Sequence, residues 1–169
     1  MEYKASLDLT SKIITGLVTV LFLGIALSNF WMIRTQWSNW TQVGANIFLT
    51  TFILMIYGFC YILRPLGYTV DGNRITVKRP FKNYVLDIRK VKKVIFANTD
   101  SMKWTLRTFG NGGLFGYFGK FRNKTFGNMT WYATRRSNYV IIETTDNRRI
   151  VLTPDDPKMI NEIENQMRK

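Results

Sequence analysis

The 169-residue sequence contains no histidine and a single cysteine, Cys60. Without histidine, the most common general base and imidazole metal ligand are absent. One cysteine allows neither an intramolecular disulfide nor a thiolate metal cluster. Carboxylates are also dispersed, since only Asp155 and Asp156 stand next to each other. We therefore expect a protein without enzymatic activity, cofactor or metal.

Acidic residues are scarce: 11 Asp and Glu stand against 24 Lys and Arg, and the net charge is +13. Most of this excess follows residue 63, where 21 of the basic and 9 of the acidic residues lie. A basic region of this kind favours an anionic partner, such as a lipid headgroup surface, a nucleic acid or an acidic protein. Nucleic acid is disfavoured, because the aromatic residues gather in one glycine-rich stretch and the basic residues lie elsewhere.

Charge is missing altogether from two long stretches near the N-terminus. Residues 13–33 are uncharged and would form a helix about 32 Å long, and a second apolar stretch covers about residues 43–63. Each is long enough to cross a bilayer, and a chain of this length has no core that would hide two such helices. The first stretch exceeds the apolar region of a signal peptide, and a second span follows it directly. We predict a transmembrane hairpin within residues 1–64.

The basic residues around this hairpin predict its orientation. The connector at 34–42 carries only Arg34, whereas Lys4 and Lys12 precede the first span and many basic residues follow the second. By the positive-inside rule, both termini are then cytoplasmic, in the plasma (inner) membrane. Trp37 in the connector is typical of the headgroup level. No charged residue lies within either span, so a transport path is not indicated.

Residues 65–169 show short β-rich runs separated by turns, which predicts an α+β domain. Asp71-Gly72-Asn73 lies between two such runs and is a hairpin signature. About seven strands are expected, at residues 68–70, 75–77, 84–88, 91–97, 129–134, 139–145 and 149–153.

A closing amphipathic helix is predicted over residues 156–168. Asp155 or Asp156 is suited to cap it, and Pro157 suits its first turn. Its apolar face follows helical spacing and comprises Met159, Ile160, Ile163 and Met167.

Residues 99–125 combine five glycines with many aromatic side chains. Either these rings enter a lipid interface or a partner's groove, or the stretch is a hairpin that folds onto its own core, and we favour the hairpin. A nucleotide loop is excluded, since no Gly-Lys-Ser or Gly-Lys-Thr follows. The candidate interface residues are Phe109, Leu114, Phe115, Tyr117, Phe118 and Phe121.

Two groups of basic residues are candidate anion sites. The first would face the anionic leaflet, where each cation contributes about 1 kcal/mol, unless it is a solvated face that obeys the positive-inside rule. Arg135 and Arg136 beside Tyr132 are a candidate anion clamp, because guanidinium groups offer paired donors; otherwise they are an ordinary strand-end feature. The first group comprises Arg74, Lys78, Arg79, Lys82, Arg89, Lys90, Lys92 and Lys93.

Three motifs resemble the bacterial PH-like (pleckstrin-homology-like) domains of small membrane proteins. They are TFGNGGLFGYFG at 108–119, YATRR at 132–136 and IVLTPDDP at 150–157, and the resemblance covers about residues 66–167. It implies a β-barrel or sandwich closed by a C-terminal helix, and some relatives also carry two N-terminal transmembrane helices. The inositol-lipid specificity of eukaryotic PH domains is not implied, because their binding motif has no match here.

The function expected from these features is that of a membrane-anchored, non-enzymatic binding or scaffolding protein. Its basic domain would engage a membrane-associated partner protein or the anionic inner leaflet. Two alternatives remain open: an accessory subunit of a membrane enzyme or transport complex, and a nucleic-acid-binding membrane protein. The sequence does not define the oligomeric state or the partner.

Overall fold

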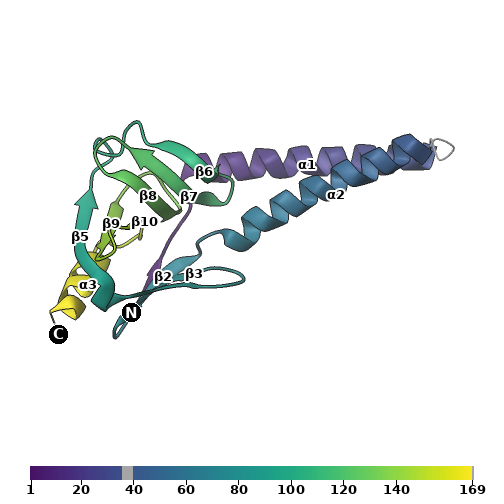
Figure 1. Cartoon of the computed structure of the whole chain (residues 1–169). Coiled ribbons are helices and arrows are strands. Elements are labelled where there is room, and N and C mark those ends of the chain that lie inside the picture. Colours follow the sequence, from purple (N-terminus) through teal and green to yellow (C-terminus); the bar gives the residue numbers. More distant parts are fainter. Residues whose placement is uncertain (36–39, 169) are drawn as a thin grey trace.

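The computed structural model describes residues 1–35 and 40–168, and it consists of a helix pair that projects from a β domain (Figure 1). The helices are α1 (Leu9–Thr35) and α2 (Trp40–Leu63), and both predicted spans lie within them. Trp37 of the predicted connector lies outside the described residues. Both ends of the described chain lie in the β domain, on the side away from the helix tip.

The two helices are apolar and largely uncovered. The most apolar 18-residue windows of α1 and α2 have mean hydropathies of 2.1 and 1.9, and none of either window is buried within the chain. Leu17, Val20 and Phe48, for example, are about two-thirds exposed (67%, 69% and 72%). A core helix of a soluble protein would be buried. Both helices are therefore long and apolar enough to cross a membrane, and they lack the covering that a soluble core would provide.

Polar side chains join the two helices to each other. Thr19 Oγ1 lies 2.8 Å from the Tyr57 hydroxyl, and the Asn29 amide donates to Thr50 Oγ1. The Tyr57 ring also packs edge-on against Phe22, with 5.6 Å between ring centroids. These contacts hold α1 and α2 as an antiparallel pair, and the helices separate only near the β domain (Figure 1).

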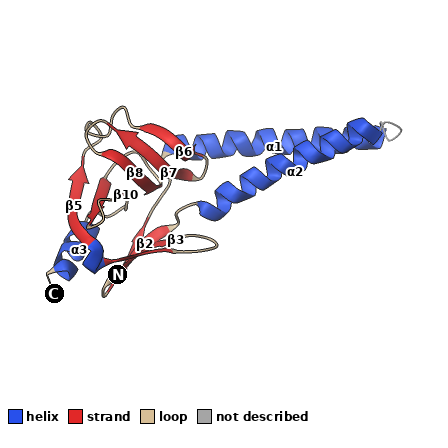
Figure 2. Ribbon diagram, viewed as in Figure 1, coloured by secondary structure: helices blue, strands red, loops and turns tan. Residues whose placement is uncertain are grey.

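The β domain is a sandwich of two open sheets (Figure 2). The first is fully antiparallel, in the order β1-β2-β3-β4: β1 (Glu2–Lys4), β2 (Gly67–Asp71), β3 (Arg74–Lys78) and β4 (Tyr84–Asp87). A short 3₁₀ helix, η1 (Ile88–Lys90), leads into the second sheet.

The second sheet has six strands in the order β5-β9-β10-β8-β7-β6. Among the described strands of this sheet, only the β10–β8 pair is parallel. The strands are β5 (Val91–Ala97), β6 (Leu106–Gly113), β7 (Gly116–Asn123), β8 (Gly127–Ala133), β9 (Tyr139–Thr144) and β10 (Arg149–Leu152).

The core lies between the sheets and continues on the other face of the second sheet. Because successive strand residues point to opposite faces, Val140 and Ile142 of β9 enter one cluster and Ile141 enters the other. Val151 of β10 joins Ile141 in that second cluster. β9 and β10 are therefore buried on both faces and form the centre of the domain.

The closing helix α3 (Met159–Met167) is shorter than predicted but buries the expected face. Met159 and Ile163 are fully buried in the core between the sheets. No described side chain caps the helix N-terminus: Asp156 accepts from the Lys158 backbone N–H in the preceding turn, and Asp155 binds Ser6 instead.

The predicted α+β class, with two N-terminal helices, a PH-like sandwich and a closing helix, is confirmed. Ten strands are present among the described residues where about seven were expected. The additional strands are β1, which joins the sheet from the opposite end of the chain, and β6 and β7, which form from the glycine-rich stretch. The sheets do not close into a barrel, so the domain is a sandwich.

Candidate functional site

The candidate site is the junction at which the β domain grips the helix pair. Its first part is the hairpin tip, residues 113–116, between β6 and β7. Gly113 and Gly116 pair across the hairpin with φ values of 148° and 118°, and Phe115 between them has a φ of 60°. Such φ values are easy only for glycine, so Phe115 holds a strained conformation. The Asn111 amide bonds both the N–H and the carbonyl of Leu114 and fixes the turn.

Phe115 enters the space where α1 and α2 separate. Its backbone N–H donates to Thr15 Oγ1 of α1 at 2.9 Å. Its ring lies edge-on against Tyr57 and Tyr61 of α2, with centroid distances of 5.1 and 5.5 Å. The Arg64 guanidinium lies 4.2 Å from the Tyr61 ring centroid. Phe115 is only 6% exposed, so the hairpin tip is a wedge between the two helices.

The tip also approaches α1 through its backbone. The fully buried Ser11 hydroxyl donates to the Gly113 carbonyl at 2.5 Å. A Cβ atom on Gly113 would lie 2.7 Å from the Ile14 Cδ1 atom, well inside normal contact. Glycine at this position therefore permits the close approach of β6 to α1.

Asp8 links the start of α1 to the sandwich. Its carboxylate accepts from the Ser11 N–H at 2.8 Å, as a helix N-cap does, and from the Arg136 N–H at 3.1 Å. The Tyr117 hydroxyl lies 3.2 Å from the same carboxylate, and the Asp8 N–H donates to the Thr134 carbonyl. Burial, and next the charge of Asp8, raises the pKa of Tyr117 to about 12. One carboxylate thus caps α1 and fastens it to β7 and to the segment after β8.

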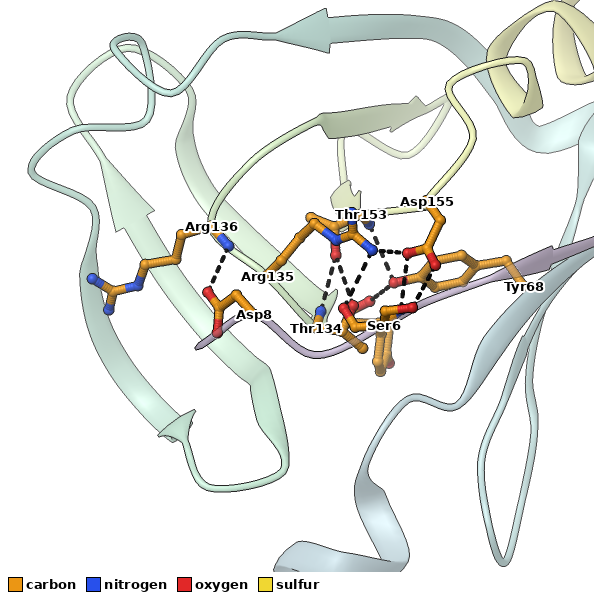
Figure 3. Close-up of polar contacts among 9 residues, drawn as sticks. Ser6, Asp8, Tyr68, Thr134, Arg135, Arg136, Thr153 and Asp155 are labelled. Carbon is orange, nitrogen blue, oxygen red and sulfur yellow. Dashed lines mark hydrogen bonds and ion pairs between the residues drawn. The ribbon is translucent and has the colours of Figure 1, made fainter. Parts of the chain in front are cut away.

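Residues 1–8 form a strap along the sandwich before α1 begins (Figure 3). Ser6 donates its backbone N–H and its hydroxyl to the Asp155 carboxylate, at 2.9 and 2.5 Å. Arg135 pairs with that carboxylate and also donates to the Ser6 carbonyl at 3.3 Å. The Arg135 side chain is 17% exposed, so this ion pair is largely shielded from water. The strap is therefore held by a charge-assisted network.

A buried hydroxyl network lies beside the strap (Figure 3). Tyr68 donates to the Tyr132 carbonyl at 2.6 Å and accepts from the Thr153 N–H at 3.2 Å. The Thr153 hydroxyl in turn accepts from the Thr134 N–H at 2.9 Å. Burial raises the pKa of Tyr68 to about 12. The network joins β2, β8 and β10 at the end of the sandwich where the strap passes.

A family model described as "Bacterial PH domain" matches residues 66–167, which is more than half of the chain. The chain belongs to the bacterial PH domain family. No curated protein and no solved structure matched it at significant similarity. The family match begins after α2, so the strap and both helices lie outside the matched part of this PH domain protein.

The predicted basic group does not form one surface on the PH domain. Lys78, Arg79 and Lys82 lie in or beside the β3–β4 loop, residues 79–83, which extends toward the side from which the helices leave (Figure 2). Arg89 and Lys90 lie in η1, next to α3 at the opposite end of the domain. Lys92 and Lys93 follow in β5, and Arg74 begins β3 at the Asp71-to-Arg74 turn.

Two of these cations form ion pairs with other described residues. Lys78 forms an ion pair with Glu2 of β1 at 2.8 Å, and Arg89 pairs with Asp87 at 2.8 Å. The Arg89 hydrogen bonds lower the pKa of Asp87 to about 2. The Arg79 guanidinium lies 5.4 Å from the Tyr132 ring centroid. Lys82, Lys90, Lys92 and Lys93 extend into solvent.

The two arginines of the predicted clamp do not converge (Figure 3). Arg135 points to Asp155, whereas the Arg136 guanidinium points away from it, 4.9 Å from the Tyr117 ring centroid. An external anion would have to displace Asp155 from Arg135. In this structure Arg135 positions the strap.

The six predicted interface residues divide into three environments. Tyr117 and Phe121 belong to the domain's own core, as the favoured hairpin interpretation predicts, and Phe118 is also buried. Phe115 is the wedge between the helices, and Leu114 beside it is half-buried. Phe109 alone among the six is exposed, at 78%.

The sequence interpretation did not include Ser6, Asp8 or Phe81 among the site residues. Asp8, three residues before Ser11 and five before the apolar run that starts at Ile13, is a helix-start signal that identifies it as a cap. Its contacts with Tyr117 and Arg136 carry no sequence signal, because the partners lie more than 100 residues away. Phe81 is 83% exposed at the tip of the β3–β4 loop, between Arg79 and Lys82.

Proposed function

We propose that this PH domain protein is a membrane-anchored, non-enzymatic binding or scaffolding module with both termini in the cytoplasm and its helix pair in the plasma (inner) membrane. The observation that carries the proposal is the uncovered apolar surface of α1 and α2, joined to a basic domain by the wedge and the strap. In water, so large an exposed apolar surface would drive aggregation, whereas a bilayer covers it.

The role of α1 in the junction supports its retention as a membrane helix. Ser11, Thr15 and the cap Asp8 each bond the PH domain, and α1 also packs on α2. Removal of α1, as in signal-peptide cleavage, would eliminate these contacts. The basic excess of the domain and the single basic residue in the connector favour the cytoplasmic orientation.

The junction holds the domain in a defined pose at the bilayer. With the helices inserted, the β3–β4 loop faces the same leaflet that the helices enter (Figure 1). It presents the exposed Phe81 ring next to the exposed Lys82, with the half-buried Arg79 packed against Tyr132 at the base of the loop. Such a combination suits the anionic headgroup layer, where the ring is buried at the interface and the cations attract phosphates. Arg89, Lys90, Lys92 and Lys93 then face away from the membrane, toward a cytoplasmic partner.

A fluorescent probe at the loop tests the leaflet contact. In a Cys60→Ser background, Phe81→Cys carries an environment-sensitive dye, and the full chain is placed in nanodiscs of anionic or zwitterionic lipid. We expect a blue shift and quenching by brominated lipid, both stronger in anionic discs and reduced by salt or by Lys82→Gln.

Asn73→Cys is the matched control, because the β2–β3 turn lies beside α3 at the far end of the domain. A dye at this position should show the emission of a water-exposed dye in every disc, with no quenching by brominated lipid. Identical spectra at positions 81 and 73 would contradict the leaflet contact. Failure of the full chain to enter nanodiscs would contradict the membrane anchor itself.

A further inference from the structure

Strand β6 is an open edge of the second sheet and carries unusual side chains for such a position. Within the described residues, it pairs with β7 on one side and with no strand on the other. α1 covers its C-terminal end through the Ser11 bond to Gly113. Residues 106–110, in contrast, are all exposed. An open strand edge offers free backbone donors and acceptors that an extended segment of another chain is able to pair with.

Large apolar side chains crowd this open part. Leu106 is 70% and Phe109 is 78% exposed, and Trp104 just before the strand is 87% exposed. Edges that proteins protect from pairing are usually short, charged or interrupted by proline. Three large apolar groups within six residues of an exposed edge are typical of an interaction surface.

A hollow beside the edge supplies a pocket for a side chain. It is lined by the apolar Trp104 and Leu106 on one side and by the cations Arg122 and Lys124 on the other, with Asn123 and Gly127 completing it. The hollow therefore brings apolar surface and two cations together next to the open edge.

The charges around β6 have a single sign. From Ser101 to Ile142 the chain contains seven basic residues and no acidic one. Arg107, Arg122 and Lys124 are exposed and form no ion pair with any residue of the described ranges 1–35 and 40–168. Cations left unpaired beside an open strand complement a negatively charged partner.

We propose that residues 104–110 dock an extended acidic segment of a partner protein, which adds as a strand to the edge of β6. Backbone pairing gives affinity, Trp104, Leu106 and Phe109 bury its apolar side chains, and Arg107, Arg122 and Lys124 select its carboxylates. A second copy of this chain fits poorly, because its own β6 carries Arg107 and no acidic residue that would complement Arg107, Arg122 and Lys124. The inference rests on the proposed binding function but does not depend on the leaflet contact.

The probe for this edge is a fluorescent ten-residue peptide of alternating valine and glutamate, titrated onto the full chain in nanodiscs. A peptide of alternating valine and lysine is the control. We expect only the acidic peptide to bind, with affinity that falls as salt rises, and its binding should slow hydrogen exchange at the amides of residues 106–110.

Variants of the β6 edge then test which side chains contact the peptide. Leu106→Ser combined with Phe109→Ser should weaken binding at least tenfold, and Arg107→Gln combined with Arg122→Gln should remove most of the salt dependence. Val85→Ser is the matched control, because Val85 is an exposed apolar residue (52%) on β4 of the other sheet. This variant should bind the peptide as tightly as the parent protein does.

The proposal would be overturned if the acidic peptide did not bind, if the lysine peptide bound equally well, or if the β6 variants left the affinity unchanged. A cross-linked dimer that Phe109→Ser abolishes would overturn it in favour of a second copy. A dye at Phe109→Cys that brominated lipid quenches as strongly as one at Phe81→Cys would assign the edge to the bilayer. These results differ from a failure of the full chain to insert into nanodiscs, which would contradict the membrane anchor instead.

Discussion

Gly110 and Gly119 face each other across β6 and β7, and neither position has room for a side chain. Their φ values are 107° and 123°. A Cβ on Gly110 would fall on the Phe118 carbonyl and 2.8 Å from the Gly119 Cα, and a Cβ on Gly119 would meet the Phe109 carbonyl in the same way. The glycine spacing of this stretch is therefore a requirement of the hairpin that carries both the wedge and the β6 edge.

Gly110→Ala should destabilise the sandwich by about 2–4 kcal/mol, because backbone atoms cannot yield and the left-handed conformation is strained for alanine. Gly112→Ala is the matched control: its Cβ would meet only the flexible end of Arg107, at 3.1 Å, and should cost less than about 1 kcal/mol. Thermal denaturation of the full chain in detergent measures both. Equal losses from the two variants would contradict this packing.

Three buried tyrosines make the fold sensitive to alkaline pH. Burial is the main cause that raises the pKa of Tyr68, Tyr117 and Tyr139 to about 12, above the ordinary value of 10. The fold therefore favours the neutral phenol. The free energy of unfolding that depends on the neutral phenol is of the order of 2–3 kcal/mol for Tyr68. This stabilisation is complete below pH 10 and is lost as pH rises from 10 to 12.

A pH titration of the full chain checks this sensitivity by two signals. Absorbance at 295 nm should show these phenols ionising together with the loss of near-ultraviolet circular dichroism, after the exposed tyrosines have titrated. Ionisation of all eight tyrosines near pH 10 in an intact sandwich would show that they are not buried as described.

At the scale of elements, the sequence correctly predicted the helices and strands that depend on residues close together in the chain. The uncharged runs predicted both long helices, the Asp71-to-Asn73 turn predicted the hairpin of β2 and β3, and the helical spacing of apolar residues predicted α3. The glycine-rich stretch was expected to form a hairpin, but the bounds of β6 and β7 were not predicted, because its five closely spaced glycines interrupt the apolar alternation on which strand prediction depends. The wedge position of Phe115 was equally inaccessible, since its partners Thr15 and Tyr57 lie in a separate helix pair.

The strap shows a further limit of local reasoning. β1 is three residues long and pairs with β2, more than 60 residues away, so nothing in residues 2–4 alone marks a strand. Likewise, Arg135 and Arg136 were grouped because they are adjacent in sequence, but Arg135 is held by Asp155 and Ser6. Both β1 and the role of Arg135 depend on contacts between residues far apart in the chain, which a single sequence does not reveal.

The strap yields a prediction at this scale. Residues 66–169 expressed alone lack β1 and leave Asp155 without Ser6, whereas a fusion that joins residues 1–8 to Leu66 through a short Gly-Ser linker restores both. The fusion should be more stable by roughly 2–4 kcal/mol, since several net hydrogen bonds of about 1 kcal/mol each return. Denaturant unfolding compares the two, with Ser6→Ala and Glu2→Pro in the fusion as partial reversals. Equal stability would mean that the strap is not part of the fold.

For the whole molecule, the junction couples two parts that sequence analysis treated as separate. The wedge fills the gap between α1 and α2, and the strap returns the N-terminus to the sheet that α2 enters through β2. The domain is thus attached to the helix pair at several points on two sides. In a membrane this arrangement would fix which faces of the PH domain meet the leaflet and which remain open to partners.

The central claim is that the helix pair crosses the membrane and holds the PH domain on the cytoplasmic side. Cysteine labelling in intact cells tests it most directly, in a Cys60→Ser background with one cysteine at Ser38, which lies outside the described residues, or at Asn73. An impermeant maleimide should label Ser38→Cys from outside and should reach Asn73→Cys only after the cells are opened. Labelling of Asn73→Cys but not Ser38→Cys in intact cells would contradict the orientation, and recovery of the whole chain in the soluble fraction would contradict the anchor.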